Sequence, residues 1–250
     1  MIVFNTDLDN TMIYSYKHEI GTDKKCVEVY QGREISFVTL KTYELLKRVQ
    51  EKVLFVPTTT RTVEQYNRIN LGIGIPKYAL TCNGGVLLVD GVEDPNWYQE
   101  SLELVALSQA ELKKAELLLE NDQNRIFEVR NIRDLFLFTK CNLPKESVDN
   151  LRNQLDLAIV DVFHNGLKVY VVPKKLSKGN AVIRFRNMVN ATKVIVAGDS
   201  EFDLSMFAEA MIGLAPKDLE QKYELPDNVI SFEREDVFSE CVLEFIMNMV

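Results

Sequence analysis

Two aspartates near the start of the chain, Asp7 and Asp9, have the spacing that most clearly suggests chemistry. They directly follow the apolar run at residues 2–4, which predicts that both lie at the carboxyl end of a buried strand. Neighbouring carboxylates repel each other, and open parallel sheets bind ligands beyond their strand ends. A divalent cation and a substrate are therefore natural compensators, although a solvated acidic turn that caps a helix is the structural alternative.

Phosphoryl transfer is a reaction that can use such a pair of carboxylates. It needs a nucleophile, a cation that neutralises the phosphate oxygens and a group that protonates the departing alcohol. Asp7 can attack phosphorus and form an aspartyl phosphate, while Asp9 can protonate the leaving group and later activate water. Because a carboxylate and a phosphate are both anions, this chemistry predicts a bound cation such as Mg²⁺.

Two further apolar runs also end in polar residues. Asp199 and Asp203 follow the run at residues 194–197, and Thr59 follows the run at residues 53–56. Thr59 can donate its hydroxyl and its backbone N–H to a phosphate oxygen. In isolation, a helix cap explains Asp199 and Asp203 equally well and is the favoured explanation of Thr59, because Asp and Thr are both common at helix starts.

Lys178 is a candidate for a fixed positive charge at the same sheet edge. It lies in the sequence SKGN at residues 177–180, where an expected helix begins. Most lysines are merely solvated, so the case for Lys178 as a functional residue depends on the other candidates and not on its own position.

The elements that must position these residues are typical of an α/β protein. The three apolar runs predict buried parallel strands, and helical patterns lie between or after them, as expected of a doubly wound, Rossmann-like parallel sheet. The segments 26–30 and 34–38 predict a hairpin beside the first strand. The helical patterns cover about residues 39–51, 62–70, 180–190, 201–210 and 237–249.

The middle of the chain has a different pattern, αββαββ, which predicts an antiparallel sheet with helices on one face. We interpret it as an inserted α+β domain at residues 98–172, within a core formed by residues 1–97 and 173–250. The expected elements are helices at 101–120 and 145–155 and strands at 126–130, 135–140, 158–164 and 168–172.

Composition narrows the possible functions. The chain has 250 residues, of which 46% are hydrophobic and 26% charged, and its net charge of −8 argues against a nucleic-acid partner. Its four cysteines are far apart and show neither metal-ligand nor redox spacing. No targeting or membrane-spanning segment is evident, which leads us to expect a cytoplasmic protein, either a monomer or a small homo-oligomer.

Taken in order, four motifs resemble those of the haloacid dehalogenase-like hydrolases. They are DLDNT at residues 7–11, TTR at 59–61, SKGN at 177–180 and GDSEFD at 198–203. The inserted segment resembles the type IIB cap of Cof-type phosphatases, sucrose-phosphate phosphatases and phosphomannomutases. The sequence NGG at residues 83–85 resembles the turn at which those proteins enter the cap.

This resemblance implies a role for each candidate residue. Asp7 would be the nucleophile and Asp9 the general acid and base. The predicted Mg²⁺ ligands are Asp7, the backbone carbonyl of Asp9, Asp199 and, directly or through water, Asp203. The predicted phosphate-binding residues are Asn10, Thr59, Arg61 and Lys178.

Three positions depart from the family pattern. Phe202 stands where relatives with this cap usually have an asparagine that helps to bind phosphate, and Thr60 replaces a glycine. The lost amide removes a hydrogen bond worth about 1 kcal/mol, and Thr60 puts a close backbone approach in doubt. Asn10 also replaces the commoner glycine, a variant that sucrose-phosphate phosphatases share.

We therefore predict a Mg²⁺-dependent phosphatase for a small phosphorylated metabolite, with sugar phosphates as one candidate class. Substrate specificity is expected in the inserted domain. A phosphomutase or phosphotransferase with the same core is the alternative enzyme. A phosphate-binding regulatory protein without turnover is the alternative from another class, and Phe202 motivates it.

Overall fold

The computed structural model describes residues 1–233 and 237–250, which form two compact units. The core unit comprises Met1–Asp94 and Lys178–Val250, and the insert unit comprises Pro95–Ser177. The predicted insertion at residues 98–172 lies within the insert unit. Its role in substrate specificity stays a prediction.

The core unit is built on a five-stranded sheet in which every neighbouring pair is parallel. Its order is β15-β14-β13-β1-β5, so the first strand lies between two strands that are distant in sequence. All three strands predicted from apolar runs are confirmed. The strands are β1 (Ile2–Thr6), β5 (Leu54–Pro57), β13 (Lys193–Ala197), β14 (Ile212–Pro216) and β15 (Val229–Phe232).

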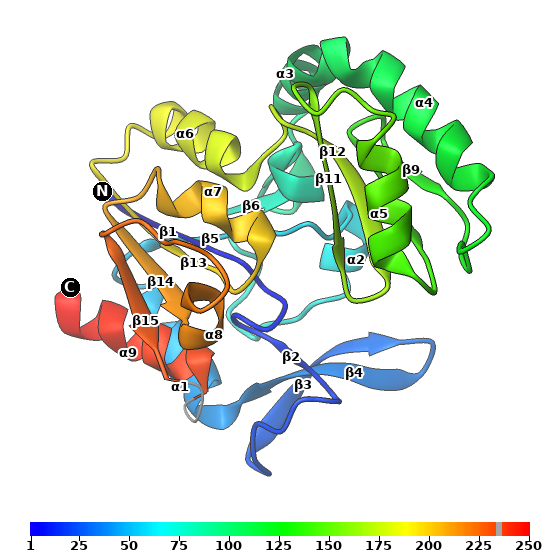
Figure 1. The fold of residues 1–250 in the computed structure, drawn as a ribbon. Coiled ribbons are helices and arrows are strands. Elements are labelled where there is room, and N and C mark those ends of the chain that lie inside the picture. Colours follow the sequence, from blue (N-terminus) through cyan, green and yellow to red (C-terminus); the bar gives the residue numbers. More distant parts are fainter. Residues whose placement is uncertain (234–236) are drawn as a thin grey trace. The chain divides into compact units, whose positions relative to one another are not determined.

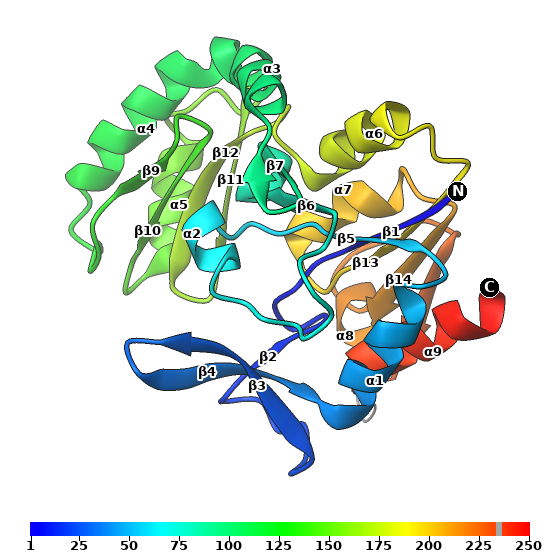
Figure 2. The same cartoon turned by 180° about the vertical axis from the view of Figure 1, so that it is seen from behind.

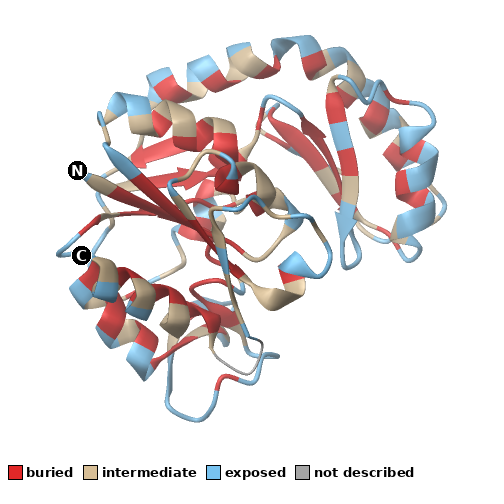
Figure 3. Ribbon diagram, turned by 60° about the vertical axis from the view of Figure 1, so that its left-hand side comes forward, coloured by how far each residue is buried: buried red, intermediate tan, exposed pale blue. Residues whose placement is uncertain are grey.

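Helices cover both faces of this sheet (Figures 1 and 2), which confirms the predicted doubly wound α/β class. One face carries α1 (Leu40–Val49) and α9 (Phe238–Met249), and the other carries α6 (Lys178–Met188) and α7 (Leu204–Phe207). The strands between these layers are mostly buried, whereas the helices alternate between buried and exposed residues (Figure 3). Both faces of the sheet are therefore covered by helices, and functional groups can be positioned at the ends of the strands.

Two predicted helices of the core unit are shorter than the sequence pattern indicated. Instead of residues 62–70, α2 covers only Val63–Tyr66, because the backbone N–H of Asn70 donates to the carbonyl of Val27 and Ile69 pairs with Glu28. These tertiary contacts end the helix. Instead of residues 201–210, a 3₁₀ turn (Glu201–Asp203) leads into α7.

The predicted hairpin is confirmed in β3 (Lys24–Tyr30) and β4 (Arg33–Thr39), and β2 (Tyr14–Ser15) adds a short edge strand. Gln31 and Gly32 form its turn, with φ values of 51° and 76°. Positive φ at both central residues is typical of a type I′ turn, whose twist matches that of paired strands. The remaining elements of the core unit are β6 (Tyr78–Thr81), β7 (Val86–Val89), β8 (Val92–Glu93), α8 (Lys217–Glu220) and the 3₁₀ turn Cys82–Gly84.

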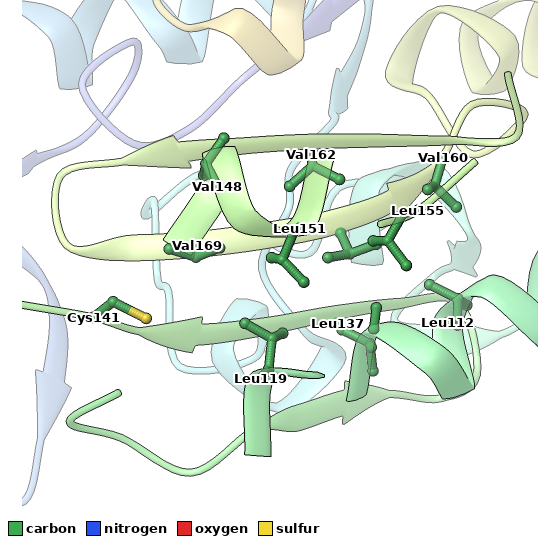
Figure 4. Close-up of a cluster of buried hydrophobic side chains, with 12 residues drawn as sticks. Leu112, Leu119, Leu137, Cys141, Val148, Leu151, Leu155, Val160, Val162 and Val169 are labelled. Carbon is green, nitrogen blue, oxygen red and sulfur yellow. The ribbon is translucent and has the colours of Figure 1, made fainter. Parts of the chain in front are cut away.

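The insert unit has an antiparallel sheet in the order β11-β12-β10-β9. One face packs on helices through a cluster of buried aliphatic side chains that includes Leu119, Leu137 and Leu151 (Figure 4). The elements are α3 (Pro95–Val105), a 3₁₀ turn (Ala106–Ser108), α4 (Gln109–Glu120), β9 (Arg130–Ile132), β10 (Phe136–Lys140), α5 (Pro144–Arg152), β11 (Val160–Asn165) and β12 (Lys168–Pro173).

Two details of this unit differ from the prediction. The helix expected at residues 101–120 is divided by the 3₁₀ turn at Ala106–Ser108, and its first part begins at Pro95, a residue suited to a first helical turn. The strand expected at 126–130 is replaced by Arg130–Ile132, which pairs with β10. Within the described part of the chain, no helix has both the length and the apolar character needed to cross a membrane.

Candidate active site

Asp7 lies at the position where the core sheet changes its winding direction. It directly follows β1, which pairs with β13 on one side and with β5 on the other. The backbone N–H of Asp7 donates to the carbonyl of Ala197 at 2.9 Å, so the ends of β1 and β13 are held together. In open α/β sheets, ligands bind at this topological switch point.

Lys178 is the centre of a buried group of charges. Its Nζ donates to Oδ1 of Asp7 and to Oδ1 of Asp203, both at 2.6 Å. The side chains of Lys178, Asp7 and Asp203 are only 1%, 8% and 0% exposed. Removing the ammonium would leave two buried carboxylates without an opposite charge, so the position of Lys178 is strongly specified.

Asp203 organises the turn that follows β13. Its Oδ2 accepts from the backbone N–H groups of Asp199 and Ser200, at 3.1 and 3.0 Å, and from the Ser200 hydroxyl at 2.8 Å. Gly198 permits this approach, since a Cβ on it would lie 2.3 Å from the Cβ of Asp203. Both oxygens of Asp203 are thus engaged in organising this turn and Lys178, and its predicted support of a metal stays a prediction.

Two residues of the DLDNT segment hold Asp199. The hydroxyl of Thr11 donates to Oδ1 of Asp199 at 3.0 Å, and the side chain of Asn10 lies close enough to lower the pKa of this carboxylate. Asn10 has a φ of 60°, a left-handed conformation that asparagine tolerates better than most residues. The structure thus places Asn10 at the acidic cluster, and its predicted contact with phosphate stays a prediction.

The carboxylates of Asp7, Asp199 and Asp203 form a possible cation site, with one oxygen from each lying within 4.8 Å of the others. Burial raises the pKa of Asp7 well above its usual range, and Lys178 only partly opposes this effect. Burial, followed by the charge of Asp203, raises the pKa of Asp199 to about 7. Lys178 alone therefore does not balance the cluster, and hard carboxylate oxygens fit a cation such as Mg²⁺.

Lys178 itself remains protonated. Burial tends to lower its pKa, but the nearby carboxylates of Asp203 and Asp7 outweigh this effect and raise the pKa above its ordinary value. A fully buried ammonium is thus a fixed positive charge at the ends of β1 and β13, and its predicted contact with phosphate stays a prediction.

Thr59 is completely buried after β5, but one of its predicted donors is already used. Its backbone N–H donates to the carbonyl of Leu80 at 2.8 Å, and the predicted contact of Thr59 with phosphate stays a prediction. The Thr59 hydroxyl accepts from the N–H of Arg61 at 3.2 Å and can still donate its own proton. The helix cap is Thr62, which forms a capping box with Gln65.

Arg61 binds the carboxylate of Asp9 through Nε and Nη2 of its guanidinium. The Nε to Oδ2 and Nη2 to Oδ1 distances are both 2.7 Å, a bidentate pair. Arg61 therefore lies next to Asp9, the predicted general acid. Its predicted role in binding phosphate stays a prediction.

Sequence reasoning missed some of the residues that shape this site. Glu28 of the hairpin binds Arg61, and the side chains of Thr11 and Ser200 bind Asp199 and Asp203. Thr11 and Ser200 lie inside two of the four motifs, so their positions could have indicated that they are part of the site. Glu28 had no comparable signal, because it lies outside all four motifs.

Comparisons with known proteins place this chain in a family and identify structures with the same fold. The model of a family described as haloacid dehalogenase-like hydrolase matches residues 92–223, more than half of the chain. No curated protein matches the sequence.

Several solved structures share the fold over nearly the whole chain. A sucrose-phosphatase from Synechocystis sp. PCC6803, solved with sucrose and phosphate, is 16% identical with a TM-score of 0.67, and the match covers 99% of this chain and 97% of that one. A phosphatase from Bacteroides thetaiotaomicron is 15% identical, with a TM-score of 0.58 and coverage of 99% and 95%. By the family match, this chain belongs to the haloacid dehalogenase-like hydrolases.

Proposed function

We propose that the protein is a Mg²⁺-dependent phosphatase that hydrolyses a small organic phosphate monoester through an aspartyl phosphate on Asp7. The observation that carries this proposal is the group of three carboxylates around the buried ammonium of Lys178 at a topological switch point. Such a group provides a nucleophile, a cation site and a fixed positive charge for a phosphate.

In the first half-reaction, a carboxylate oxygen of Asp7 attacks phosphorus and the bond from phosphorus to the ester oxygen breaks. Asp9 donates a proton to that oxygen, and the alcohol leaves. Asp9 is suited to this role because its side chain is 49% exposed, whereas Asp7 is buried. Lys178 and the hydroxyl of Thr59 bind the phosphate oxygens.

In the second half-reaction, Asp9 removes a proton from water as the water oxygen attacks phosphorus. The bond between phosphorus and the Asp7 oxygen breaks, which frees Asp7 and inorganic phosphate. The cation, held by Asp7, Asp199 and the backbone carbonyl of Asp9, would neutralise charge on the phosphate oxygens. Asp203 keeps Lys178 and the Asp199 turn in place.

We propose small phosphorylated metabolites as substrates, with sugar phosphates tested first. The sucrose-phosphatase with the same fold binds sucrose and phosphate, which supports this order. Specificity is assigned to the insert unit. There, Trp97 is only 5% exposed, and its carbonyl accepts from the hydroxyl of Ser101, so a structural anchoring role fits it better than a sugar contact.

Hydrolysis is tested with 4-nitrophenyl phosphate and a panel of sugar phosphates, nucleotides and phosphorylated cofactors, each in Mg²⁺ and in EDTA. Mg²⁺-dependent release of inorganic phosphate is expected. With radiolabelled substrate and an alcohol acceptor present, the label is expected in phosphate. Label in the acceptor would instead support the phosphotransferase, and no turnover across the panel would support the regulatory protein.

Mg²⁺ is expected to raise the melting temperature, Tm, more at pH 8 than at pH 5.5. The pKa of Asp199 is raised from 3.8 to about 7 in the folded protein, so this group stabilises the metal-free fold below pH 4, and the stabilisation is lost as the pH rises through 7. At pH 5.5, Mg²⁺ must also displace protons from its ligands. Thermal unfolding in Mg²⁺ and in EDTA measures both effects.

Asp199→Asn is the matched variant for this experiment. It removes one proposed ligand with almost no change of shape, and it should reduce the Mg²⁺-induced rise in Tm at pH 8. An equal rise at both pH values in the wild type would contradict metal binding by these carboxylates.

A further inference from the structure

Glu28 is a fully buried carboxylate on the hairpin strand β3. Its side chain is 0% exposed, and the register of β3 against β4 shifts on both sides of it. Such bulges commonly redirect a side chain. Here, Glu28 is directed toward the segment that carries Arg61 and Arg68, and not toward solvent.

Three side chains satisfy Glu28. Its Oε2 accepts from the hydroxyl of Ser36 at 2.7 Å, and its Oε1 lies 2.9 Å from Nη1 of Arg61 and 3.1 Å from Nε of Arg68. Burial alone would raise the pKa of Glu28, but Arg61, Ser36 and Arg68 outweigh this effect and lower it. Glu28 is therefore a fixed negative charge.

Arg61 connects this charge to the proposed general acid. Its Nη1 atom binds Glu28, whereas its Nε and Nη2 atoms donate to the two carboxylate oxygens of Asp9. Arg61 is only 13% exposed, whereas Asp9 is 49% exposed. The buried Glu28 thus holds the planar guanidinium of Arg61 in place, and the guanidinium in turn orients the more exposed Asp9.

The backbone also fixes this arrangement. The N–H of Asn70 donates to the carbonyl of Val27 at 2.8 Å, and Glu28 forms an antiparallel bridge with Ile69. The hairpin strand is therefore joined to the segment after α2 at the residue that binds Arg61. A buried ion pair often contributes no more stability than an apolar replacement, so stability alone gives little reason for this carboxylate.

We propose that Glu28 is a positioning residue, which holds Arg61 so that Arg61 keeps the carboxylate of Asp9 oriented for proton transfer. This inference rests on the proposed function. Glu28 itself neither gains nor loses a proton. For the proton transfer, Asp9 must carry the proton on one carboxyl oxygen while the other oxygen stays bound to Arg61. When the phosphorus–oxygen bond breaks, this proton moves to the departing oxygen, and Glu28 only fixes the position of Arg61.

Phenyl phosphate and 4-nitrophenyl phosphate form a matched pair of substrates for this proposal. Nitrophenolate is a stable anion and leaves with little help from an acid, whereas phenolate depends more on protonation. The ratio kcat/KM reports only the steps through leaving-group departure. In Glu28→Gln, kcat/KM is expected to fall about tenfold for phenyl phosphate and less than twofold for 4-nitrophenyl phosphate, because the acid is misplaced.

Two further variants complete the experiment. Arg68→Gln removes the other cation from the same Oε1 atom but leaves the contact between Arg61 and Asp9, so its substrate-selective loss should be much smaller than that of Glu28→Gln. Ser36→Ala removes only the hydrogen bond to Oε2, and it should show a smaller loss in the same direction as Glu28→Gln. If Glu28→Gln does not fold, Ser36→Ala decides the outcome.

An equal fall in kcat/KM for both substrates, or no fall in folded Glu28→Gln or Ser36→Ala, would overturn the positioning role. A selective loss in Arg68→Gln as large as that in Glu28→Gln would also overturn it, since that result would indicate general loosening of the hairpin. These outcomes leave the proposed function intact. The proposed function fails separately if Asp7→Asn retains full phosphatase activity.

Discussion

Asp7→Asn is expected to lower kcat for phosphate release by at least about 1000-fold. The amide has nearly the same shape as the carboxylate, but it cannot form the acyl phosphate. Steady-state hydrolysis of 4-nitrophenyl phosphate in Mg²⁺ measures this loss. Exposed Asp149 in α5 offers a control, because Asp149→Asn removes an equal charge far from any proposed catalytic residue in the sequence.

Loss of activity in Asp7→Asn should not reflect unfolding. The pKa of Asp7 is raised by burial, so its ionised form opposes folding at pH 8 in the absence of metal. Replacing it with a neutral amide is expected to leave the Tm in EDTA unchanged or to raise it. A variant that remains folded and active would contradict Asp7 as the nucleophile.

Lys178→Met is expected to destabilise the fold and to lower kcat strongly. It leaves Asp7 and Asp203 buried without their opposite charge, and breaking such a pair costs about 3–5 kcal/mol, which lowers the Tm on the order of 10 °C in a chain of this size. Loss of the ammonium from the phosphate site should reduce kcat about 100-fold or more. Thermal unfolding and hydrolysis assays measure the two effects.

The destabilisation by Lys178→Met should be larger at pH 8 than at pH 5. Without the ammonium, the raised pKa of Asp7 rises further, so the buried carboxylates take up protons at low pH and lose the unfavourable charge. Lys145→Met, at an 84% exposed lysine that pairs with Asp149, is the control and should not measurably change the Tm. Similar changes in Tm for both lysines would contradict the buried charge centre.

The strands and the first set of site residues could be predicted because they obey local rules. Apolar runs marked β1, β5 and β13, and polar residues directly after them mark the carboxyl edge of a parallel sheet. Parallel neighbours then bring Asp7 and Asp199 together without any knowledge of side-chain contacts. Lys178 needed the resemblance as well, since a lysine at a helix start is not distinctive.

Features that depend on tertiary contacts could not be predicted. The strand β14 contains Gly213 and Pro216, both poor strand residues, and Gly213 is required because a Cβ there would lie 2.7 Å from the ring of Phe207. The contact between Glu28 and Arg61 depends on register shifts in β3. A sequence pattern with period two does not reveal such shifts, because each one changes which side chain is buried.

Trapping of the phosphorylated enzyme tests the central claim most directly. An acyl phosphate is reduced by borohydride to an alcohol, which converts a phosphorylated aspartate to homoserine. Wild-type enzyme and Asp9→Asn, in which water activation is slowed, are quenched during turnover of 4-nitrophenyl phosphate, reduced, digested and analysed by mass spectrometry. We expect homoserine at position 7 in both, with more in Asp9→Asn. Homoserine at another aspartate, or none in an enzyme that turns over, would contradict an aspartyl phosphate on Asp7.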